Sequence, residues 1–272
     1  MKRVKIRVFR YNPADGADAR YDEFEVEAER WTTVLDALLY IKAHKDHSIA
    51  LRYSCRMASC GSCGMVINGI PRLACYTKVY ELGSDVITCR PLTNFPIIRD
   101  LATDFTAFFA KHKSMRPYII NDAVDRIDGR EFLQKPEEVE KYLQFSYCIK
   151  CGLCYAACPT VATDKRFPGP QALAQMYRYL IDSRDMATDE RLKVVDDRHG
   201  VWRCHFAGSC SMVCPKGVDP ALGIQLLRAY LLGMSRDSKV VAELYRREKY
   251  IYLSLSIHAS TIHIYLICKY YY

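Results

Sequence analysis

The sequence predicts an α+β protein in which a mixed α/β module precedes an all-α module. Apolar and charged residues alternate over residues 3–10, as in a strand with one buried face. Beyond about residue 105 the apolar residues recur with helical spacing and strand signals nearly vanish. The chain has 272 residues, half of them hydrophobic, which is enough for two cores. We therefore expect modules at 1–105 and 106–235, followed by a C-terminal tail at 236–272.

The first module carries further strand, helix and turn signals. A second strand is expected at 22–29, and a helix is expected to begin after Thr33. Thr33 and Asp36 have the spacing of a capping box, which satisfies backbone N–H groups at a helix start. The pair Asn68–Gly69 lies between two apolar runs and predicts a β-hairpin with a tight turn. A last strand is expected near Asp85–Pro91.

Helical periodicity dominates the second module and continues into the tail. Four helices are expected in the module, at Phe105–Lys113, Pro136–Leu143, Gln171–Asp182 and Pro220–Leu232. In the tail, Ser238–Lys249 is a candidate amphipathic helix, and Ile251–Cys268 is free of charge but contains Ser, Thr and His. This last stretch is near the length of a membrane span, but its polar content disfavours one. An unstructured tail and a segment that packs on a membrane partner remain open.

Charge and the N-terminal residues limit the function classes. The net charge of +8 is modest, and the basic residues form no run typical of a nucleic-acid-binding arm. The surface could face anionic lipid or an acidic partner. The N-terminal residues resemble neither a signal peptide nor a transit peptide, so a prokaryotic-type chain at the cytoplasmic side is expected. The 13 cysteines then indicate metal binding, because cytoplasmic thiols stay reduced.

The first cysteine group has the spacing of a plant-type ferredoxin loop. Cys55, Cys60 and Cys63 form C-x4-C-x2-C, which is typical of a [2Fe–2S] cluster. Cys75, at the far side of the predicted hairpin, is the expected fourth ligand, although its gap is shorter than usual. The glycines that flank Ser62–Cys63 would let the backbone approach the inorganic sulfides. A structural zinc site prefers paired C-x2–4-C knuckles and fits this spacing poorly. Cys89 is expected to be a buried thiol outside the set.

The second cysteine group has the spacing of a bacterial ferredoxin. Its four cysteines follow C-x2-C-x2-C-x3-C-P, at Cys148, Cys151, Cys154 and Cys158. In two-cluster ferredoxins the fourth cysteine of such a run ligates the other cluster, so a partner run is expected. It is present at Cys204, Cys210 and Cys214, with Ala207 where a further cysteine would stand.

Crossed ligation assigns these cysteines to two different clusters. Cys148, Cys151 and Cys154 with the crossing Cys214 would hold a [4Fe–4S] cluster. The other set has three thiolates, from Cys158, Cys204 and Cys210. Because Ala207 cannot bind iron, a [3Fe–4S] cluster is expected there. We expect this cluster to be easier to reduce than one that keeps the fourth iron and thiolate.

These motifs closely resemble those of the iron–sulfur subunits of succinate dehydrogenase and fumarate reductase. The resemblance runs from residue 1 to about 234 and includes Asn94–Asp100 and Arg116–Ile119, which resemble the family's linker. It implies a plant-ferredoxin-like β-grasp domain followed by a bacterial-ferredoxin-like helical domain. It also implies a non-flavin subunit of succinate:quinone oxidoreductase (succinate dehydrogenase, respiratory complex II). The partners would be an FAD-containing flavoprotein and a membrane anchor that binds quinone and can hold haem b.

The same resemblance implies a quinone site beside the [3Fe–4S] cluster. Pro159, His205, Phe206 and Arg228 would lie near the quinone by motif position. Two alternatives remain open: His205 could instead orient the cluster loop, and Arg228 could lie on a solvated helix face. A tryptophan common in the succinate dehydrogenase branch is absent, and Val161–Thr163 stand there. Related complexes with another donor or acceptor, of the thiol-linked fumarate reductase or glycerol-phosphate dehydrogenase type, are the alternative; a zinc module is the more distant one.

Overall fold

The computed structural model describes residues 1–16, 18–122 and 131–233. Residues 1–227 belong to one compact unit, and Arg228 begins a second. The helix predicted at Ser238–Lys249 and the uncharged stretch Ile251–Cys268 lie outside the described residues. Among the described residues, no helix is long and apolar enough to cross a membrane.

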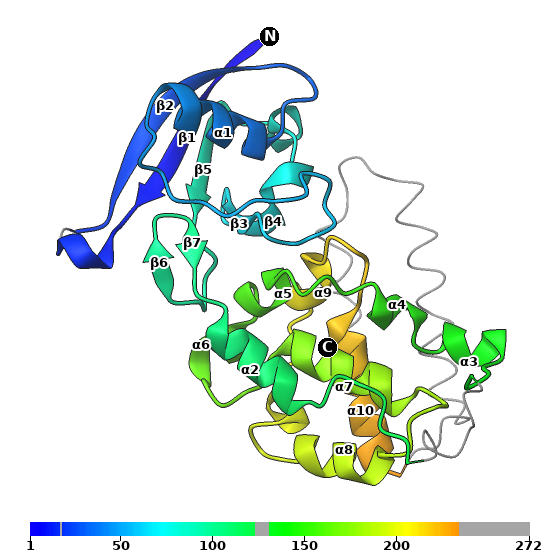
Figure 1. Ribbon diagram of the computed structural model, residues 1–272. Helices are drawn as coiled ribbons and strands as arrows, with labels where there is room; N and C mark the ends of the chain where they lie inside the picture. The colour runs from blue at the N-terminus through cyan, green and yellow to red at the C-terminus, as the bar shows by residue number, and fades with distance from the viewer. Residues whose placement is uncertain (17, 123–130, 234–272) are drawn as a thin grey trace. The chain divides into compact units, whose positions relative to one another are not determined.

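The first half of the larger unit contains a five-stranded mixed sheet with one helix (Figure 1). The strand order is β2-β1-β5-β3-β4, in which β1 and β5 are parallel and the other neighbours antiparallel. The elements are β1 (Lys2–Arg10), β2 (Arg20–Ala28), α1 (Val34–His44), β3 (Gly64–Ile67), β4 (Ile70–Leu73) and β5 (Val86–Arg90). The strands and helix predicted for this module are all present, within two residues at most bounds.

Alternation in β1 and the cap of α1 explain how this core forms. Val4, Ile6 and Val8 of β1 are buried, while the basic residues between them are not. The predicted capping box is present, since Thr33 Oγ1 accepts from the Asp36 N–H and Asp36 accepts from the Thr33 N–H. The buried face of α1 closes this core.

The hairpin between β3 and β4 turns at the residues that the sequence indicated. Asn68 has φ 48° and Gly69 has φ 83°, so both central residues of the turn are left-handed. Such a turn matches the right-handed twist of the paired strands. The hairpin leads directly into the 3-10 turn Ala74–Tyr76, which carries Cys75.

A small two-stranded sheet, β6 (Ile97–Arg99) and β7 (Ala102–Thr103), follows the main sheet and was not predicted. The Asp100 carboxylate fastens it to the first module. It accepts hydrogen bonds from Arg10 Nε at 3.2 Å and from the N–H groups of Tyr11 at 3.0 Å and Ala50 at 2.9 Å. Asp100 and Arg10 are both buried, so this junction is fixed by paired charges.

The second half of the unit is helical. Its helices are α2 (Thr106–Ser114), α3 (Pro136–Glu140), α4 (Leu143–Ser146), α5 (Leu153–Ala156), α6 (Pro159–Thr163), α7 (Pro170–Leu180), α8 (Thr188–Val195), α9 (Ser209–Met212) and α10 (Pro220–Leu231). The single helix predicted at Pro136–Leu143 is wrong, because the chain breaks between α3 and α4. Tyr142 has φ −121° there, and its buried side chain donates from the hydroxyl to Gln134 Oε1 at 2.8 Å. Helices α5, α6, α8 and α9 were not predicted.

The two long helices α7 and α10 approach each other closely. A Cβ on Gly223 of α10 would lie 3.3 Å from Ala174 Cα of α7 and 3.0 Å from the Phe145 ring. Only a residue without a side chain allows this approach. The short helices α5, α6 and α9 contain or adjoin cysteines. Helix α7, most of whose residues are buried, lies in the interior of that region.

Candidate metal centres

The loop that contains Cys55, Cys60 and Cys63 is wound tightly by left-handed residues. Arg56 has φ 58°, Ala58 has φ 57° and Gly61 has φ 75°. Successive residues with such alternating backbone geometry turn their N–H groups inward and form an anion-binding concavity. The loop therefore suits negatively charged sulfur.

Backbone N–H groups of this loop point at the thiol sulfurs. Cys55 Sγ accepts from the N–H groups of Met57 at 3.4 Å, Ser59 at 3.3 Å and Cys60 at 3.2 Å. Cys60 Sγ accepts from the Ser62 N–H at 3.5 Å. Hydrogen bonds to cluster sulfurs stabilise negative charge and help to set the reduction potential.

The hairpin returns Cys75 to this loop. Cys75 N–H donates to Cys63 Sγ at 3.4 Å, and Ala58 N–H donates to Cys75 Sγ at 3.3 Å. The short gap between Cys63 and Cys75 is thus bridged by β3 and β4, which fold straight back. The four predicted thiols of the first set meet at one loop.

The two ends of this set differ in environment. Hydrogen bonding from Ser62, together with the backbone bond from Cys55, lowers the pKa of the exposed Cys60 thiol to about 6. Burial raises the pKa of the Cys63 thiol to about 12. The set is therefore open to solvent on the Cys60 side and closed on the side of the core.

A cavity in the helical half is lined by the four cysteines of the predicted [4Fe–4S] set. Cys148 follows α4, Cys154 lies on α5 and Cys214 follows α9, and together with Cys151 they surround the cavity. Burial raises the pKa of the Cys151 thiol to about 12 and raises that of Cys154 as well. Thiols this buried need cationic partners before they can ionise.

A neighbouring cavity is lined by the three cysteines of the predicted [3Fe–4S] set. Cys158 caps α6, Cys204 follows the 3-10 turn Val201–Arg203, and Cys210 lies on α9. Ala207 lines the same cavity. The cysteines are therefore arranged in the crossed manner, because Cys158 belongs in sequence to the run of Cys148 but lines the cavity of the partner run.

The shape of these sites fits iron–sulfur clusters. The second and third thiol sets each line a cavity. Within residues 1–16, 18–122 and 131–233, no three His, Cys, Asp or Glu side chains converge on a position for a single metal ion. Thiolate donors with inward N–H groups are the donor set that these clusters use.

The three sets form a continuous series. A Cβ on Gly61 would lie 2.8 Å from Cys151 Cβ, so the first loop touches the second thiol set. A Cβ on Gly64 would lie 3.3 Å from the Cys151 carbonyl oxygen. Gly61 and Gly64 therefore allow the close contact between the two cysteine loops. The sequence did not reveal this role. Helix α5, which carries Cys154, packs against α9, which carries Cys210, so the second set lies beside the third.

Asn94 links the modules near the cysteines. Its side-chain Nδ2 donates to the carbonyls of Tyr155 at 2.9 Å, Ala156 at 3.1 Å and Cys158 at 3.2 Å. The carbonyls of Tyr155 and Ala156 lie at the end of the short helix α5, and that of Cys158 lies at the start of α6. Carbonyls at a helix end are commonly satisfied by such side-chain donors. The sequence marked Asn94 only as part of a linker.

The residues expected near quinone are only partly brought together. Pro159 and Phe206 line the three-cysteine cavity and are exposed, and Phe206 has φ 56°. His205 is exposed between Cys204 and Phe206 but is not among the residues that line the cavity. Arg228 is half-buried on α10, in the second unit.

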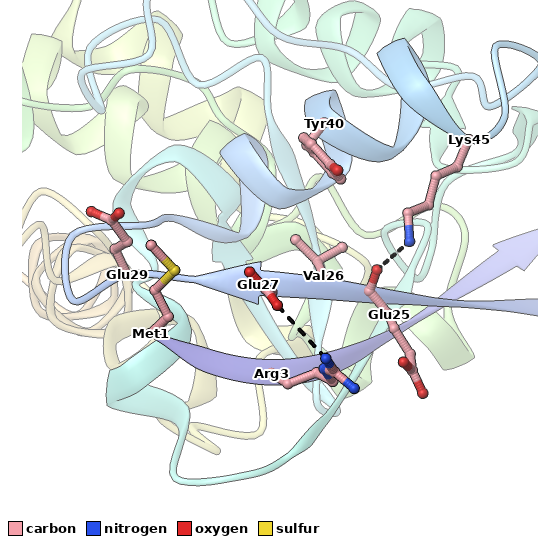
Figure 2. A pocket seen from close by; sticks show the side chains of 8 residues that line it. All are labelled: Met1, Arg3, Glu25, Val26, Glu27, Glu29, Tyr40 and Lys45. Carbon is pink, nitrogen blue, oxygen red and sulfur yellow. Dashed lines mark hydrogen bonds and ion pairs between the residues drawn. The ribbon is translucent and has the colours of Figure 1, made fainter.

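Two other features carry no cysteine chemistry. Cys89 is fully buried on β5, and burial raises the pKa of its thiol to about 12, as suits a small hydrophobic residue. Figure 2 shows a groove along β1, β2 and α1 that contains no cysteine. In this groove Arg3 pairs with Glu27 at 3.7 Å, and Lys45 Nζ donates to the Glu25 carbonyl.

Comparison with known proteins agrees with both cysteine groups. Residues 5–110 match the family "2Fe-2S iron-sulfur cluster binding domain", and residues 144–218 match "4Fe-4S dicluster domain". The chain is 45% identical over 225 residues to the fumarate reductase iron-sulfur subunit of Shigella flexneri, covering 83% of this chain and 91% of that protein. The chain belongs to the fumarate reductase and succinate dehydrogenase iron–sulfur subunit family.

Further relatives come from both branches of this family. The Mycobacterium tuberculosis fumarate reductase iron-sulfur subunit is 43% identical over 83% of this chain and 91% of its own length. The Paracoccus denitrificans succinate dehydrogenase iron-sulfur subunit is 37% identical over 82% and 86% respectively. A chain of the "Mycobacterium smegmatis Sdh1 complex in the apo form" superposes with a TM-score of 0.76 at 26% identity, covering 88% of this chain and 99% of that one.

The family subunit is an electron-transfer protein with [2Fe–2S], [4Fe–4S] and [3Fe–4S] clusters. It is a subunit of a membrane-bound succinate dehydrogenase or fumarate reductase complex, which implies flavoprotein and anchor partners.

Proposed function

We propose that the three thiol sets hold the three clusters in one order along the chain's fold. The [2Fe–2S] cluster is held by Cys55, Cys60, Cys63 and Cys75; the [4Fe–4S] cluster by Cys148, Cys151, Cys154 and Cys214; and the [3Fe–4S] cluster by Cys158, Cys204 and Cys210. When bound, the clusters supply one-electron carriers between FAD of the flavoprotein and quinone at the anchor. The chain's own residues fix the spacing, the hydrogen bonds and the burial.

The contact between Gly61 and Cys151 is the observation that carries this order. A Cβ on Gly61 would overlap the Cys151 side chain at 2.8 Å, so the first and second sets are in contact. The second and third sets share the segment from Cys154 to Cys158 and the helix α9. The middle position of the [4Fe–4S] set follows from these contacts.

Each of the two outer sets has exposed residues close to it in the chain, which suits exchange with partners. Cys60 is exposed and stands beside the exposed Met57, on the side proposed to face the flavoprotein. At the other end Pro159 and Phe206 are exposed at the three-cysteine cavity, and His205 is exposed next to Phe206, on the side proposed to face quinone. Arg228 is proposed as a further quinone-proximal residue on motif position alone. The anchor would hold this side at the cytoplasmic face of the membrane.

The activity proposed for the assembled complex is succinate:quinone oxidoreduction, as in succinate dehydrogenase. Net fumarate reduction is the second candidate, and the 45% and 43% identities to fumarate reductase subunits, against 37% to a succinate dehydrogenase subunit, favour it. The ratio of succinate oxidation to fumarate reduction rates in the purified complex distinguishes them.

Spectroscopy of serine variants tests the ligand sets. In the complex, Cys75→Ser is expected to change the EPR signal of the reduced [2Fe–2S] cluster, and Cys204→Ser that of the oxidised [3Fe–4S] cluster. Cys89→Ser, a buried cysteine outside all three sets, is the matched control and should change no signal. A change of the [2Fe–2S] signal in Cys89→Ser but not in Cys75→Ser would contradict the assignment.

A further inference from the structure

Asp164 is a buried carboxylate at the end of the short helix that follows Cys158. Helix α6 begins directly after Cys158, and Asp164 caps its C-terminus, where its N–H donates to the Thr160 carbonyl at 2.8 Å. Asp164 is 8% exposed. It is not among the residues that line the three-cysteine cavity, so any effect on that site passes through its neighbours or its charge.

The segment that leads to Cys204 makes two contacts with this carboxylate. His199 Nδ1 lies 2.6 Å from Asp164 Oδ2, and Arg203 Nε donates to the same oxygen at 3.2 Å. The other oxygen, Oδ1, accepts from the Arg166 N–H at 2.9 Å. Arg203 directly precedes Cys204 in the chain. The carboxylate therefore joins the end of α6 to the segment before Cys204.

The position of the proton on His199 follows from a second neighbour. Arg198 Nε donates to His199 Nε2 at 2.9 Å, so Nε2 is the accepting nitrogen. The neutral imidazole then carries its proton on Nδ1 and donates it to Asp164. This hydrogen bond from His199 lowers the pKa of Asp164 to about 2, so the carboxylate is ionised. Its negative charge faces the guanidinium of Arg203.

The three-cysteine site needs such a contact more than the other two sites do. Its thiols come from two segments that are far apart in the chain, and the contacts of Asp164 with His199 and Arg203 span 35 and 39 residues. Helix α6 has only five residues, and helices of that length are not stable by themselves. With three thiolates instead of four, fewer ligands hold the two segments together.

We propose that Asp164 is a positioning residue for the [3Fe–4S] cluster, because it holds the segment before Cys204 against α6 and balances the charge of Arg203 beside that ligand. The position of Cys204 relative to Cys158 then depends on Asp164. So does the potential of the cluster, since a negative charge nearby disfavours an added electron and a positive charge favours it. The inference rests on the proposed ligands Cys158 and Cys204.

Asp182 provides a matched control in the helical half. It is 1% exposed and also pairs with an arginine, accepting from Arg184 Nε at 2.9 Å and Nη2 at 2.8 Å. It further accepts from Gln134 Nε2 at 3.0 Å. Asp182 lines neither cysteine cavity, and these partners include no proposed ligand. Replacing it removes a buried charge of the same kind away from the clusters.

EPR-monitored redox titration of the complex tests the effect of the charge. Asp164→Asn keeps an oxygen that can accept hydrogen bonds but leaves Arg203 unbalanced, so it should raise the midpoint potential of the [3Fe–4S] cluster. Arg203→Gln should lower that potential, and Asp182→Asn should leave it unchanged. An unchanged or lower potential in Asp164→Asn, or an equal rise in Asp182→Asn, overturns the proposal.

The EPR line shape of the oxidised [3Fe–4S] cluster tests the effect on position. Asp164→Ala should broaden or shift this signal while the [2Fe–2S] signal stays as it is, and His199→Gln should change it less. Asp182→Ala should lower the stability of the complex in chemical denaturation without changing the signal. If Cys204→Ser leaves the signal unchanged, the ligand assignment is wrong; a signal that depends on Cys204 but not on Asp164 overturns this inference alone.

Discussion

Ala207 has a methyl side chain at the position where the spacing of the cysteine run would place a thiol. Ala207 lines the cavity of Cys158, Cys204 and Cys210, so it forms part of the wall of this site. Three thiolates leave one corner of a cubane without a protein ligand. The residue at 207 therefore decides between the three-iron and the four-iron form in this interpretation.

Ala207→Cys should convert the third site towards [4Fe–4S]. The change restores a fourth thiolate at the spacing of the run, and the expected result is loss of the [3Fe–4S] EPR signal of the oxidised complex. Ser209→Cys places a thiol in the lining of the same cavity at the wrong spacing and should keep that signal. An unchanged signal in Ala207→Cys would contradict the role of Ala207.

At the scale of elements, the loop Cys55–Cys63 and the loop Cys148–Cys151 depend on glycine for their contact. Gly61→Ala meets two obstacles, a left-handed φ of 75° and a Cβ 2.9 Å from Cys151 Cα. The left-handed conformation costs about 1–2 kcal/mol for alanine, and the crowding adds about 1–3 kcal/mol. We expect a lower melting temperature and a weaker magnetic interaction between the reduced [2Fe–2S] and [4Fe–4S] clusters.

Gly69→Ala is the control for backbone strain alone. Gly69 has φ 83°, but a Cβ there meets nothing within 4 Å. It should lower stability by about 1–2 kcal/mol and leave the magnetic interaction unchanged. Equal effects of the two variants on the interaction would show that the loop contact does not set the cluster spacing.

The small sheet β6–β7 depends on Asp100 for its attachment to β1. Asp100→Ala leaves the buried Arg10 with only its partly exposed partners and leaves the N–H groups of Tyr11 and Ala50 unpaired. Removing one member of a buried pair costs about 3–5 kcal/mol. Chemical denaturation of the complex should show this loss, whereas Asp85→Ala, which breaks an exposed pair with Lys2, should cost less than about 0.5 kcal/mol. Equal losses would contradict the role of the junction.

Elements with strong local signals could be predicted, and those set by tertiary contacts could not. Alternation in β1, the capping box of α1 and the Asn68–Gly69 turn each act within a few residues, and the structure confirms them. The break between α3 and α4 and the small sheet β6–β7 depend instead on the buried Tyr142 and on Asp100. Tyr142 accepts from Arg184, 42 residues away, and Asp100 from Arg10, 90 residues away. Cysteine spacing predicted which thiols share a cavity, but Asn94 gave no signal because its contact with the Tyr155 carbonyl spans 61 residues.

At the scale of the whole molecule, the two halves of the larger unit obtain stability in different ways. The first half has a five-stranded sheet with its own core, which includes Ile6, Leu38 and Ile87. The second half places its cysteines on or beside α4, α5, α6 and α9, which have only four or five residues each. Isolated helices of this length are not stable in water, so they depend on what they surround.

Removal of all three clusters by a chelator under reducing conditions should therefore loosen the second half far more than the first. Buried thiols such as Cys151 and Cys210, whose pKa burial raises to about 12, would return to the neutral form and no longer tie the short helices together. Hydrogen exchange of the holo and apo chain should show protection lost in 143–163 and 201–218 but kept in β1, β2 and β5. Equal loss in the sheet would mean that the first half also needs its cluster to fold, because its core alone would then be insufficient.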